Sequence, residues 1–233
     1  MAIWNTPLSQ WRRVIPLALV IALGGCGDSN DDGAGPFNAA LVLNGGAAPN
    51  LPGLLSPDAE IDNRVTGSIG DGPIVGARVR VFDKSLALLQ ESVNNSADYD
   101  IRIKTKARNY PLSIVADQGS DLVSGRAPDF ALLTVIDKPA TRSVGNLNPF
   151  STLIFKSALR NGGISKTNLD NARQALLTYY AFGLDTAVFA DPVSTVVTDS
   201  NIAQIVKSSE MLGEMIRRTR DALTATGVVI SGD

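Results

Sequence analysis

Between residues 64 and 146, hydrophobic and polar positions alternate with a period of two. The segments 77–81 (ARVRV) and 99–103 (YDIRI) each place small or aliphatic residues on one face and charged residues on the other. Successive side chains of a strand point to opposite faces of a sheet, so each segment predicts a half-buried strand. The run 130–136 (FALLTVI) is nearly continuous and predicts a more fully buried strand. Several short strands separated by Gly, Pro, Asn and Asp predict an antiparallel β-sandwich.

After Asn148 the hydrophobic residues recur with the period of an α-helix. Asn148-Pro149 supplies an N-cap residue and a proline at the first helical position, which predicts a short helix over 150–160. A second helix is predicted from about 168 to 182. A third is predicted over roughly 202–226, with Asn201 as its N-cap and Gln204 three residues later. The fold class is therefore predicted as α+β, with a β-sandwich followed by a small helical region.

The start of the chain has the form of a secretory signal peptide. Arg12-Arg13 precedes the apolar run 14–23, which is shorter than the roughly 20 residues needed to span a bilayer. A charged segment, a short apolar segment and small residues at its end are typical of a segment that is cleaved on export.

The end of that run resembles the lipobox of bacterial lipoproteins. Its residues are Leu23, Gly24, Gly25 and Cys26. The resemblance implies cleavage before Cys26, a diacylglycerol thioether on its sulfur and acylation of the new amine, as with palmitate. Several acyl chains anchor a protein durably, whereas one binds only marginally. Gly27 stands where Asp would signal inner-membrane retention in enterobacterial lipoproteins, so the resemblance implies an outer-membrane, cell-envelope location.

These patterns divide the chain into four parts. Residues 1–25 are predicted to be the signal peptide, 26–62 a flexible linker, 63–147 the β-sandwich module and 148–233 the helical region. The linker prediction rests on a shift to Gly, Asn, Asp, Ala and Pro. Such a coil spans roughly 30–35 Å on average and would hold a folded unit away from a surface.

The β-region carries a second resemblance. Its opening, residues 67–81 (GSIGDGPIVGARVRV), is similar to that of carboxypeptidase regulatory-like domains, also called transthyretin-like modules. CNA-B-like adhesin repeats share this opening. A later family feature, a polar turn leading to Gly-x-Tyr, is kept in part, because Tyr99 is present but Ala97 stands in place of Gly. The resemblance implies an Ig-like or transthyretin-like sandwich that serves as a stalk, spacer or binding scaffold without catalysis.

The composition of the chain excludes several common catalytic and metal-binding mechanisms. The chain has no His and one Cys, so triads that use His, His-ligated metals and disulfides have no residues from which to form, and no cofactor or metal is expected. Loss of residues 1–25 removes two arginines and no acid, which leaves a mature charge of 19 − 23 = −4. This small negative net charge gives no reason to expect nucleic acid as a partner. The expected partners are the membrane, through the lipid, and envelope proteins or glycans.

The predicted function is a lipid-anchored, non-catalytic binding or structural module, and two alternatives stay open. One is a polysaccharide-processing enzyme that uses two carboxylates. The acids closest to predicted loops are Asp98, Asp100, Asp117 and Asp121. The other is a partner-recruiting subunit of an export or adhesion assembly, docked through the third helix.

Two further groups have both a functional and a structural interpretation. Arg217, Arg218 and Arg220 could contact anionic headgroups, but they also suit the negative end of a helix and a solvated face, which we prefer. Tyr179, Tyr180 and Phe182 could stack on sugar rings. Their spacing requires some of them to face the core, so packing is the preferred interpretation.

Overall fold

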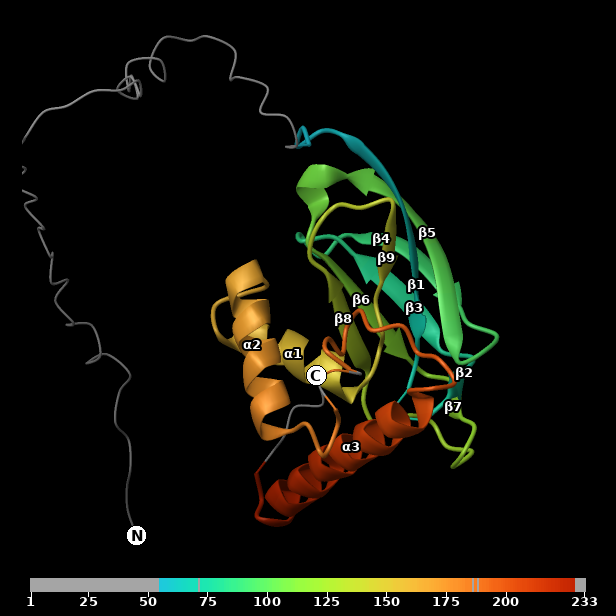
Figure 1. Cartoon of the computed structure of the whole chain (residues 1–233), viewed down its shortest axis with the longest axis vertical. Coiled ribbons are helices and arrows are strands. Elements are labelled where there is room, and N and C mark those ends of the chain that lie inside the picture. Colours follow the sequence, from blue (N-terminus) through green and yellow to red (C-terminus); the bar gives the residue numbers. More distant parts are fainter. Residues whose placement is uncertain (1–54, 71, 186, 188, 229–233) are drawn as a thin grey trace, which may run out of the picture. The chain divides into compact units, whose positions relative to one another are not determined.

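The computed structural model describes residues 55–70, 72–185, 187 and 189–228. The predicted signal peptide and most of the predicted linker lie outside this set. Residues Leu51–Asp233 cluster as one compact unit. Its elements are of mixed α and β type, as the sequence predicts (Figure 1).

Two main sheets form the β-region, with a small two-stranded sheet beside them. The first has the order β5-β1-β9, the second β4-β3-β6-β8, and the small sheet pairs β2 with β7. The strand bounds are β1 (Glu60–Ser68), β2 (Ile74–Val75), β3 (Arg78–Phe82), β4 (Leu88–Val93), β5 (Asp98–Lys106), β6 (Leu112–Asp117), β7 (Ser120–Asp121), β8 (Leu132–Ile136) and β9 (Arg142–Val144). A short 3₁₀ turn, η2 (Ala107–Asn109), follows β5.

The alternating pattern decides which faces of the sheets meet. Val65 on β1, Val79 on β3 and Ile114 on β6 are fully buried in one core cluster that draws on both main sheets. The opposite face of β1 and β5 is charged, with diagonal pairs between Arg64 and Asp100 and between Arg102 and Asp62. The two main sheets therefore form a sandwich-like pair around one apolar core.

One strand pairing departs from the predicted antiparallel arrangement. Strand β9 runs parallel to β1, with Val65 opposite Ser143. The chain leaves β8 in the four-stranded sheet and returns at the free edge of β1 in the other sheet, so β9 arrives in the same direction as β1. The other pairings between named strands of the described chain are antiparallel, and an isolated parallel bridge joins Ile69 to Leu147.

Strand β8 is buried on both faces, as its continuous apolar run predicts. Leu132 and Ile136 join the sandwich core, while Val135 packs in a second cluster with Phe150 and Ile154. That second cluster belongs to the helices α1 (Pro149–Arg160), α2 (Lys166–Tyr179) and α3 (Ile202–Ala225). The helical region is thus built on the outer side of an edge strand of the sandwich.

Hydroxyl groups at the start of α1 occupy the free edge of β8. The Leu133 amide donates to Thr152 Oγ1 at 2.9 Å, and Ser151 Oγ donates to the Leu133 carbonyl oxygen at 2.8 Å. An exposed strand edge leaves backbone groups without partners and invites pairing with other chains. Here two side chains take the place of a neighbouring strand.

The first helix begins as the sequence predicts, whereas the third does not. Asn148 Oδ1 accepts from the Ser151 amide at 2.8 Å, and Pro149 is the first residue of α1. The prediction that Asn201 caps α3 with its side chain is wrong. Its Oδ1 accepts instead from the Thr198 amide at 2.8 Å and its Nδ2 donates to the Val196 carbonyl, so the side chain folds back to stabilise the preceding loop.

Asn146 and Asn148 join the loop before α3 to the end of the sandwich. Asn146, which is 2% exposed, accepts from the Ser68 amide at 3.2 Å and donates to the Thr195 carbonyl at 2.7 Å. Its backbone amide donates to the Val193 carbonyl at 2.7 Å. Asn148 Nδ2 donates to the Pro192 carbonyl at 3.1 Å. We call these bonds the asparagine clasp.

Replacement of Asn146 should destabilise the whole unit. Asn146→Ala removes the side-chain partner of part-buried backbone groups of Ser68 and Thr195, and we expect the free energy of unfolding to fall by about 2 kcal/mol. Urea unfolding followed by circular dichroism measures this change. Asn95→Ala, at an exposed turn position, is the matched control and should stay within about 0.5 kcal/mol of the parent. Equal stability of the two variants would contradict the clasp.

Candidate binding groove

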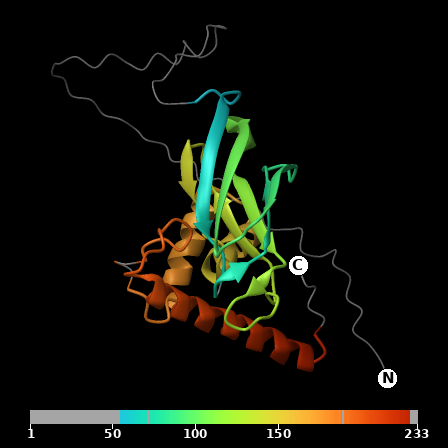
Figure 2. The ribbon, with the colours of Figure 1, turned by 90° about the vertical axis from the view of Figure 1, so that its right-hand side faces the viewer.

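Helix α3 lies across the end of the sandwich at which β1 terminates (Figures 1 and 2). Two cavities open at this end of the sandwich. One lies between helix α3 and the end of β1, and the other lies between the end of β1, the turn that joins β4 to β5 and the loop before α3. They share the lining residues Ser68, Asp98 and Val197, so they adjoin each other, and we call the two together the groove.

The wide cavity has a volume of about 560 Å³ and lies along the strand ends. Its lining comes from β1, the end of β4, the turn before β5, the start of β5, β9 and the loop at 196–197. Tyr99 borders it with a buried ring whose hydroxyl donates to the Gly145 carbonyl oxygen. Burial raises the pKa of the Tyr99 phenol well above its ordinary value, so this group stays neutral and serves as a structural donor.

The narrow cavity, of about 290 Å³, lies between the end of β1 and helix α3. Apolar side chains form one wall, including Ile69 from the sandwich and Ile205 from the helix. Exposed carboxylates at Asp98 and Asp199 border it from the sandwich and from the loop before α3. Ser209, on the buried face of α3, also borders it.

A buried asparagine fixes the turn that carries Asp98 to the groove. Asn94 Oδ1 accepts from the Ala77 amide at 2.5 Å, and Nδ2 donates to the Ile74 carbonyl at 2.8 Å. The backbone amide of Ile69 then donates to the Ala97 carbonyl at 2.7 Å, which holds the start of β5 against the end of β1. The position of Asp98 therefore follows from hydrogen bonds within the sandwich.

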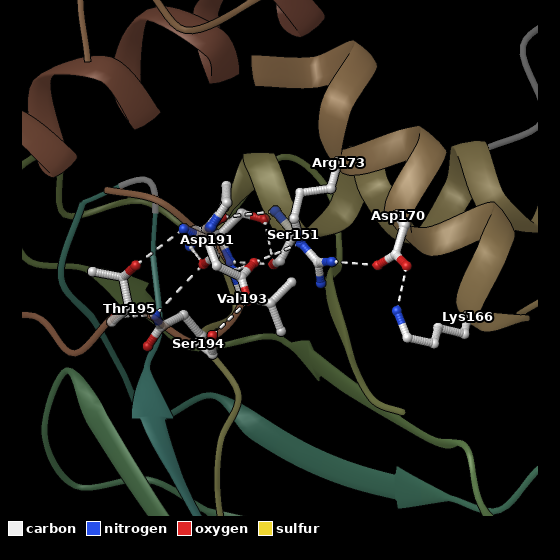
Figure 3. A network of polar contacts seen from close by, with 11 residues as sticks. Ser151, Lys166, Asp170, Arg173, Asp191, Val193, Ser194 and Thr195 are labelled. Atoms are coloured by element: carbon white, nitrogen blue, oxygen red, sulfur yellow. Dashed lines mark hydrogen bonds and ion pairs between the residues drawn. The ribbon is translucent and has the colours of Figure 1, made fainter. Parts of the chain in front are cut away.

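A polar network fixes the other side of the groove (Figure 3). Arg173 on α2 donates to Asp170 Oδ1 at 2.9 Å and to Asp191 Oδ1 at 2.8 Å. Asp191 in turn accepts from the Val193 amide at 3.1 Å. The loop 191–195 is thereby tied to α2 on one side and to the asparagine clasp on the other. This loop leads into Val196 and Val197, which border the groove.

Two of the four predicted acids are engaged by arginine. Asp100 pairs with Arg64, and Asp117 pairs with Arg78 and Arg80. Hydrogen bonds from Arg64 lower the pKa of Asp100, and those from Arg78 lower the pKa of Asp117 against the opposing effect of burial. Both carboxyls are therefore held as carboxylates.

The other two acids have different environments. Asp121 accepts from the Val123 amide at 2.8 Å and from Ser124 Oγ at 2.8 Å, which stabilises its own loop. Asp98 lies at the groove with an exposed side chain. The structure thus brings Asp98 and Asp100 to the groove lining and leaves Asp117 and Asp121 outside it.

The three arginines of α3 make ion pairs with nearby acids. Arg217 lies 3.1 Å from Glu214 and 3.7 Å from Asp129 in the loop before β8. Arg218 also pairs with Glu214, and Arg220 pairs with Asp221. Arg218 lies on a solvated face as predicted, whereas Arg217 is mostly buried and joins α3 to the β-region.

The packing interpretation of the three aromatic residues holds for one of them. Phe182 is partly buried against the helical core. Tyr179 is 76% exposed and Tyr180 is 40% exposed, so the prediction that some of the three residues face the core is confirmed by Phe182, and Tyr179 lies in solvent. Helix α2 ends at Tyr179, and the following residues no longer keep the helical stripe that would place both rings on the core side.

Ser209 was not predicted as a site residue. The sequence does place Ser209 on the apolar stripe of the third helix, because it lies four residues after Ile205 and three before Leu212, which both belong to that stripe. A polar residue on such a stripe requires a partner. The apolar neighbours alone gave no indication that a cavity adjoins it.

The predicted anchor residues Leu23, Gly24, Gly25 and Cys26 lie outside the described residues. In the part of the chain that the structure does describe, no helix is both long and apolar enough to cross a bilayer. The same residues contain no group of three or more His, Cys, Asp or Glu side chains placed to hold a metal ion.

Comparisons of the chain with protein-family models, with curated proteins and with solved structures gave no match.

Protonation of Asp117 should make part of the stability acid-sensitive. Because its pKa is lowered in the folded state, its contribution is present above the unfolded pKa of about 3.9 and is lost as pH falls through the folded value. Asp117→Asn should cost about 1 kcal/mol at pH 7, and the difference from the parent should shrink towards pH 3.

Urea unfolding at pH 7, 5, 4 and 3 measures this dependence. Asp221→Asn, which removes a carboxylate with 67% exposure, is the control. A stability difference for Asp117→Asn that stays constant over the whole range would show that the ion pairs contribute nothing.

Proposed function

We propose that this chain is a lipid-anchored cell-envelope protein whose folded unit acts as a non-catalytic binding or structural module. The observation that carries the proposal is the sequence Leu23-Gly24-Gly25-Cys26 directly after a short apolar run and a pair of arginines. An anchor formed by several acyl chains holds the rest of the chain at a membrane surface without a spanning helix. Gly27 after the cysteine favours the outer membrane as the location.

We further propose that the β-region is a module of the carboxypeptidase regulatory-like, or transthyretin-like, type. The residues of the shared opening have physical roles that support this. A Cβ at Gly67 would lie 2.3 Å from the Gly145 carbonyl oxygen, and Gly76 has a φ of 70°. Ala77 is 1% exposed and belongs to the core of the sandwich. Gly67 thus allows a close approach of the backbone at Gly145, and Gly76 allows the left-handed turn before β3.

The position of the groove suits a module displayed from an anchor. The described chain begins at residue 55, close to the start of β1, whereas the groove lies at the other end of that strand. A strand of this length extends roughly 27 Å. The start of β1, at which the tether joins the folded unit, and the groove are therefore separated by roughly the length of that strand.

The environments of the acids favour binding over carboxylate catalysis. A glycosidase needs one carboxylic acid whose pKa is raised so that it can donate a proton. Arginine partners lower the pKa values of Asp100 and Asp117. Asp98 is exposed at the groove, and Asp121 stabilises its own loop through hydrogen bonds. These arrangements support a role in recognition.

Removal of the cysteine sulfur should release the protein from the membrane. In cells fed an alkyne analogue of palmitate, the parent chain should be labelled and should sediment with membranes. Cys26→Ser should lose the label and the membrane association, because the thioether cannot form.

Ser29→Ala is the matched control and should behave as the parent does. Undiminished labelling of the Cys26→Ser protein would refute the anchor. Loss of labelling without release would show that a second attachment holds the protein at the membrane.

A further inference from the structure

We propose that the tip of the hairpin between β3 and β4, with Leu86 at its centre, inserts into the surface of the bilayer that holds the lipid anchor. The inference rests on the anchor proposed above and adds a second, non-covalent contact with the same membrane. Three features support it. The tip exposes a leucine in a strained conformation, its neighbours suit a lipid surface, and it lies beside the point at which the tether joins the folded unit.

The hairpin tip, residues 83–87, is fixed by a buried carboxylate. Asp83, which is 8% exposed, accepts through Oδ1 from the Ser85 amide at 2.8 Å, from Ser85 Oγ at 2.6 Å and from the Ala87 amide at 3.0 Å. The Asp83 backbone amide also donates to the Ala87 carbonyl oxygen at 3.0 Å. These bonds define the shape of the tip and hold its central residue in solvent.

Leu86 is displayed at this tip at an energetic cost. Its φ of 66° lies in the left-handed region, which residues other than glycine rarely adopt, and its side chain is 76% exposed. A side chain this exposed gains little from packing within the described part of the chain. Insertion into an apolar medium would remove the cost of exposure, because transfer of a leucine side chain from water is favourable in proportion to the area buried.

The neighbours of Leu86 suit the boundary between lipid headgroups and acyl chains. Leu88, at the start of β4, is 53% exposed. Lys84, on the other side of Leu86 in the tip, is also exposed. A lysine beside an inserted leucine keeps its ammonium group among the phosphates while its aliphatic stem follows the apolar side chains. Apolar side chains with a cation beside them are what interfacial segments present to a membrane.

Hydrogen bonds place the tip next to the attachment point of the tether. The Lys84 amide donates at 3.1 Å to the carbonyl oxygen of Asn109 in the turn η2. In the same turn, the Arg108 amide donates at 2.8 Å to the carbonyl oxygen of Pro57, which precedes β1. Leu55, at which the described chain begins, is itself 57% exposed. The tip and the start of the folded unit are thus joined through η2.

The tether allows a weak contact to be effective. A flexible linker between Cys26 and Leu55, as the sequence predicts, spans roughly 30 Å on average. A module held this close to a bilayer meets its surface at a high effective concentration. The small apolar area of one hairpin tip is therefore enough for a lasting contact.

Acidic side chains near the start of β1 oppose contact with anionic headgroups. Asp58 precedes this strand and Glu60 is its first residue. Asp58 is paired with Arg108 and with Lys106, so its charge is compensated. The exposed charge of Glu60 is offset by that of Lys84. The contact is therefore driven by apolar side chains and not by net charge.

A second exposed apolar loop provides an internal comparison. Val123, in the loop that follows β7, is 78% exposed. Strand β7 pairs with β2, and the Ile74 amide of β2 donates at 3.1 Å to the carbonyl oxygen of Ile69, just beyond the end of β1. This loop therefore lies at the opposite end of β1 from the tether, where the proposal expects no contact with the bilayer.

The fluorescence of one introduced indole tests the contact. The chain has two tryptophans, Trp4 and Trp11, so Trp4→Phe with Trp11→Phe gives a full chain without an indole. Leu86→Trp or Val123→Trp is added to it, and the protein is reconstituted from nonionic detergent into vesicles of phosphatidylcholine with phosphatidylglycerol as the minor lipid. Brominated acyl chains should quench the Leu86→Trp protein at least about threefold more than the Val123→Trp protein, because interfacial insertion reaches the acyl chains.

A second pair of variants keeps the native leucine, because an indole favours membrane interfaces by itself. Leu88→Trp in the same background should be quenched while Leu86 is present. Leu86→Asn added to it should reduce the quenching at least about threefold, since asparagine tolerates the left-handed conformation but is not apolar. Val123→Asn added in its place should leave the quenching unchanged.

A melting curve keeps the result for Leu86→Asn interpretable. Because the leucine side chain is exposed and its backbone is strained, Leu86→Asn in detergent should melt at or above the temperature of the parent. A lower melting temperature would show that Leu86 stabilises the fold, and would overturn the proposal.

Two fluorescence results would also contradict the contact. Equal quenching of the Leu86→Trp and Val123→Trp proteins, or quenching of neither, would exclude a specific insertion of the tip. A blue shift of the Leu86→Trp emission without quenching by brominated lipid would assign the tip to a protein surface, such as a second copy of the chain, and would overturn the proposal as well.

Flotation of the vesicles separates this inference from the anchor. A chain that floats without quenching of the Leu86→Trp indole refutes the tip contact and leaves the anchor in place. A chain that fails to float refutes the anchor. Cys26, the sole cysteine, then carries a free thiol, so coupling it to a maleimide-bearing lipid restores the attachment. Quenching measured in that state decides the tip contact alone.

Discussion

The asparagine clasp is the constraint on which the rest of the described structure depends. Asn146 and Asn148 lie where the chain leaves the sandwich and enters α1, and their amide groups hold the loop at 192–195 against the end of β1. These side chains are buried, so their hydrogen bonds form in a medium where an unmade bond is costly. Strand β8 adds a second connection, because one of its faces belongs to the sandwich core and the other to the helical core. The sandwich and the helices are therefore parts of one packed unit.

The groove is a consequence of that connection. The hydrogen bond between Arg173 and Asp191 also attaches this loop to α2. The residues that follow the loop, Val196, Val197 and Asp199, therefore lie at the end of the sandwich, and α3 begins next to them. The helix then crosses the strand ends and encloses space that side chains do not fill completely. The sheets on one side and the long helix on the other place polar groups around this space.

Sequence patterns predicted those features that depend on neighbours in the chain. Period-two alternation identified β3 and β5, the continuous run identified β8 as a doubly buried strand, and Asn148-Pro149 marked the start of α1. Features that depend on tertiary placement were not predicted. The Asn201 side chain bonds the loop that precedes it, the parallel pairing of β9 with β1 follows from a crossover between sheets, and the exposure of Tyr179 reflects the end of α2. The second hydrogen-bond partners of Asn146 and Asn148 lie more than forty residues away in the sequence. The cavity beside Ser209 is likewise lined by sandwich residues that are distant from Ser209 in the sequence.

Native-state hydrogen exchange, followed at increasing urea concentration, tests the central claim most directly. If the clasp and β8 join the sandwich and the helices into one cooperative unit, the slowest amides of β1, β6, α1 and α3 should exchange with one common opening free energy, and the Asn146 amide should exchange with them. Exchange of the α1 and α3 amides at a much lower free energy than those of β1 and β6 would show that the helices open independently of the sandwich, and would contradict the account.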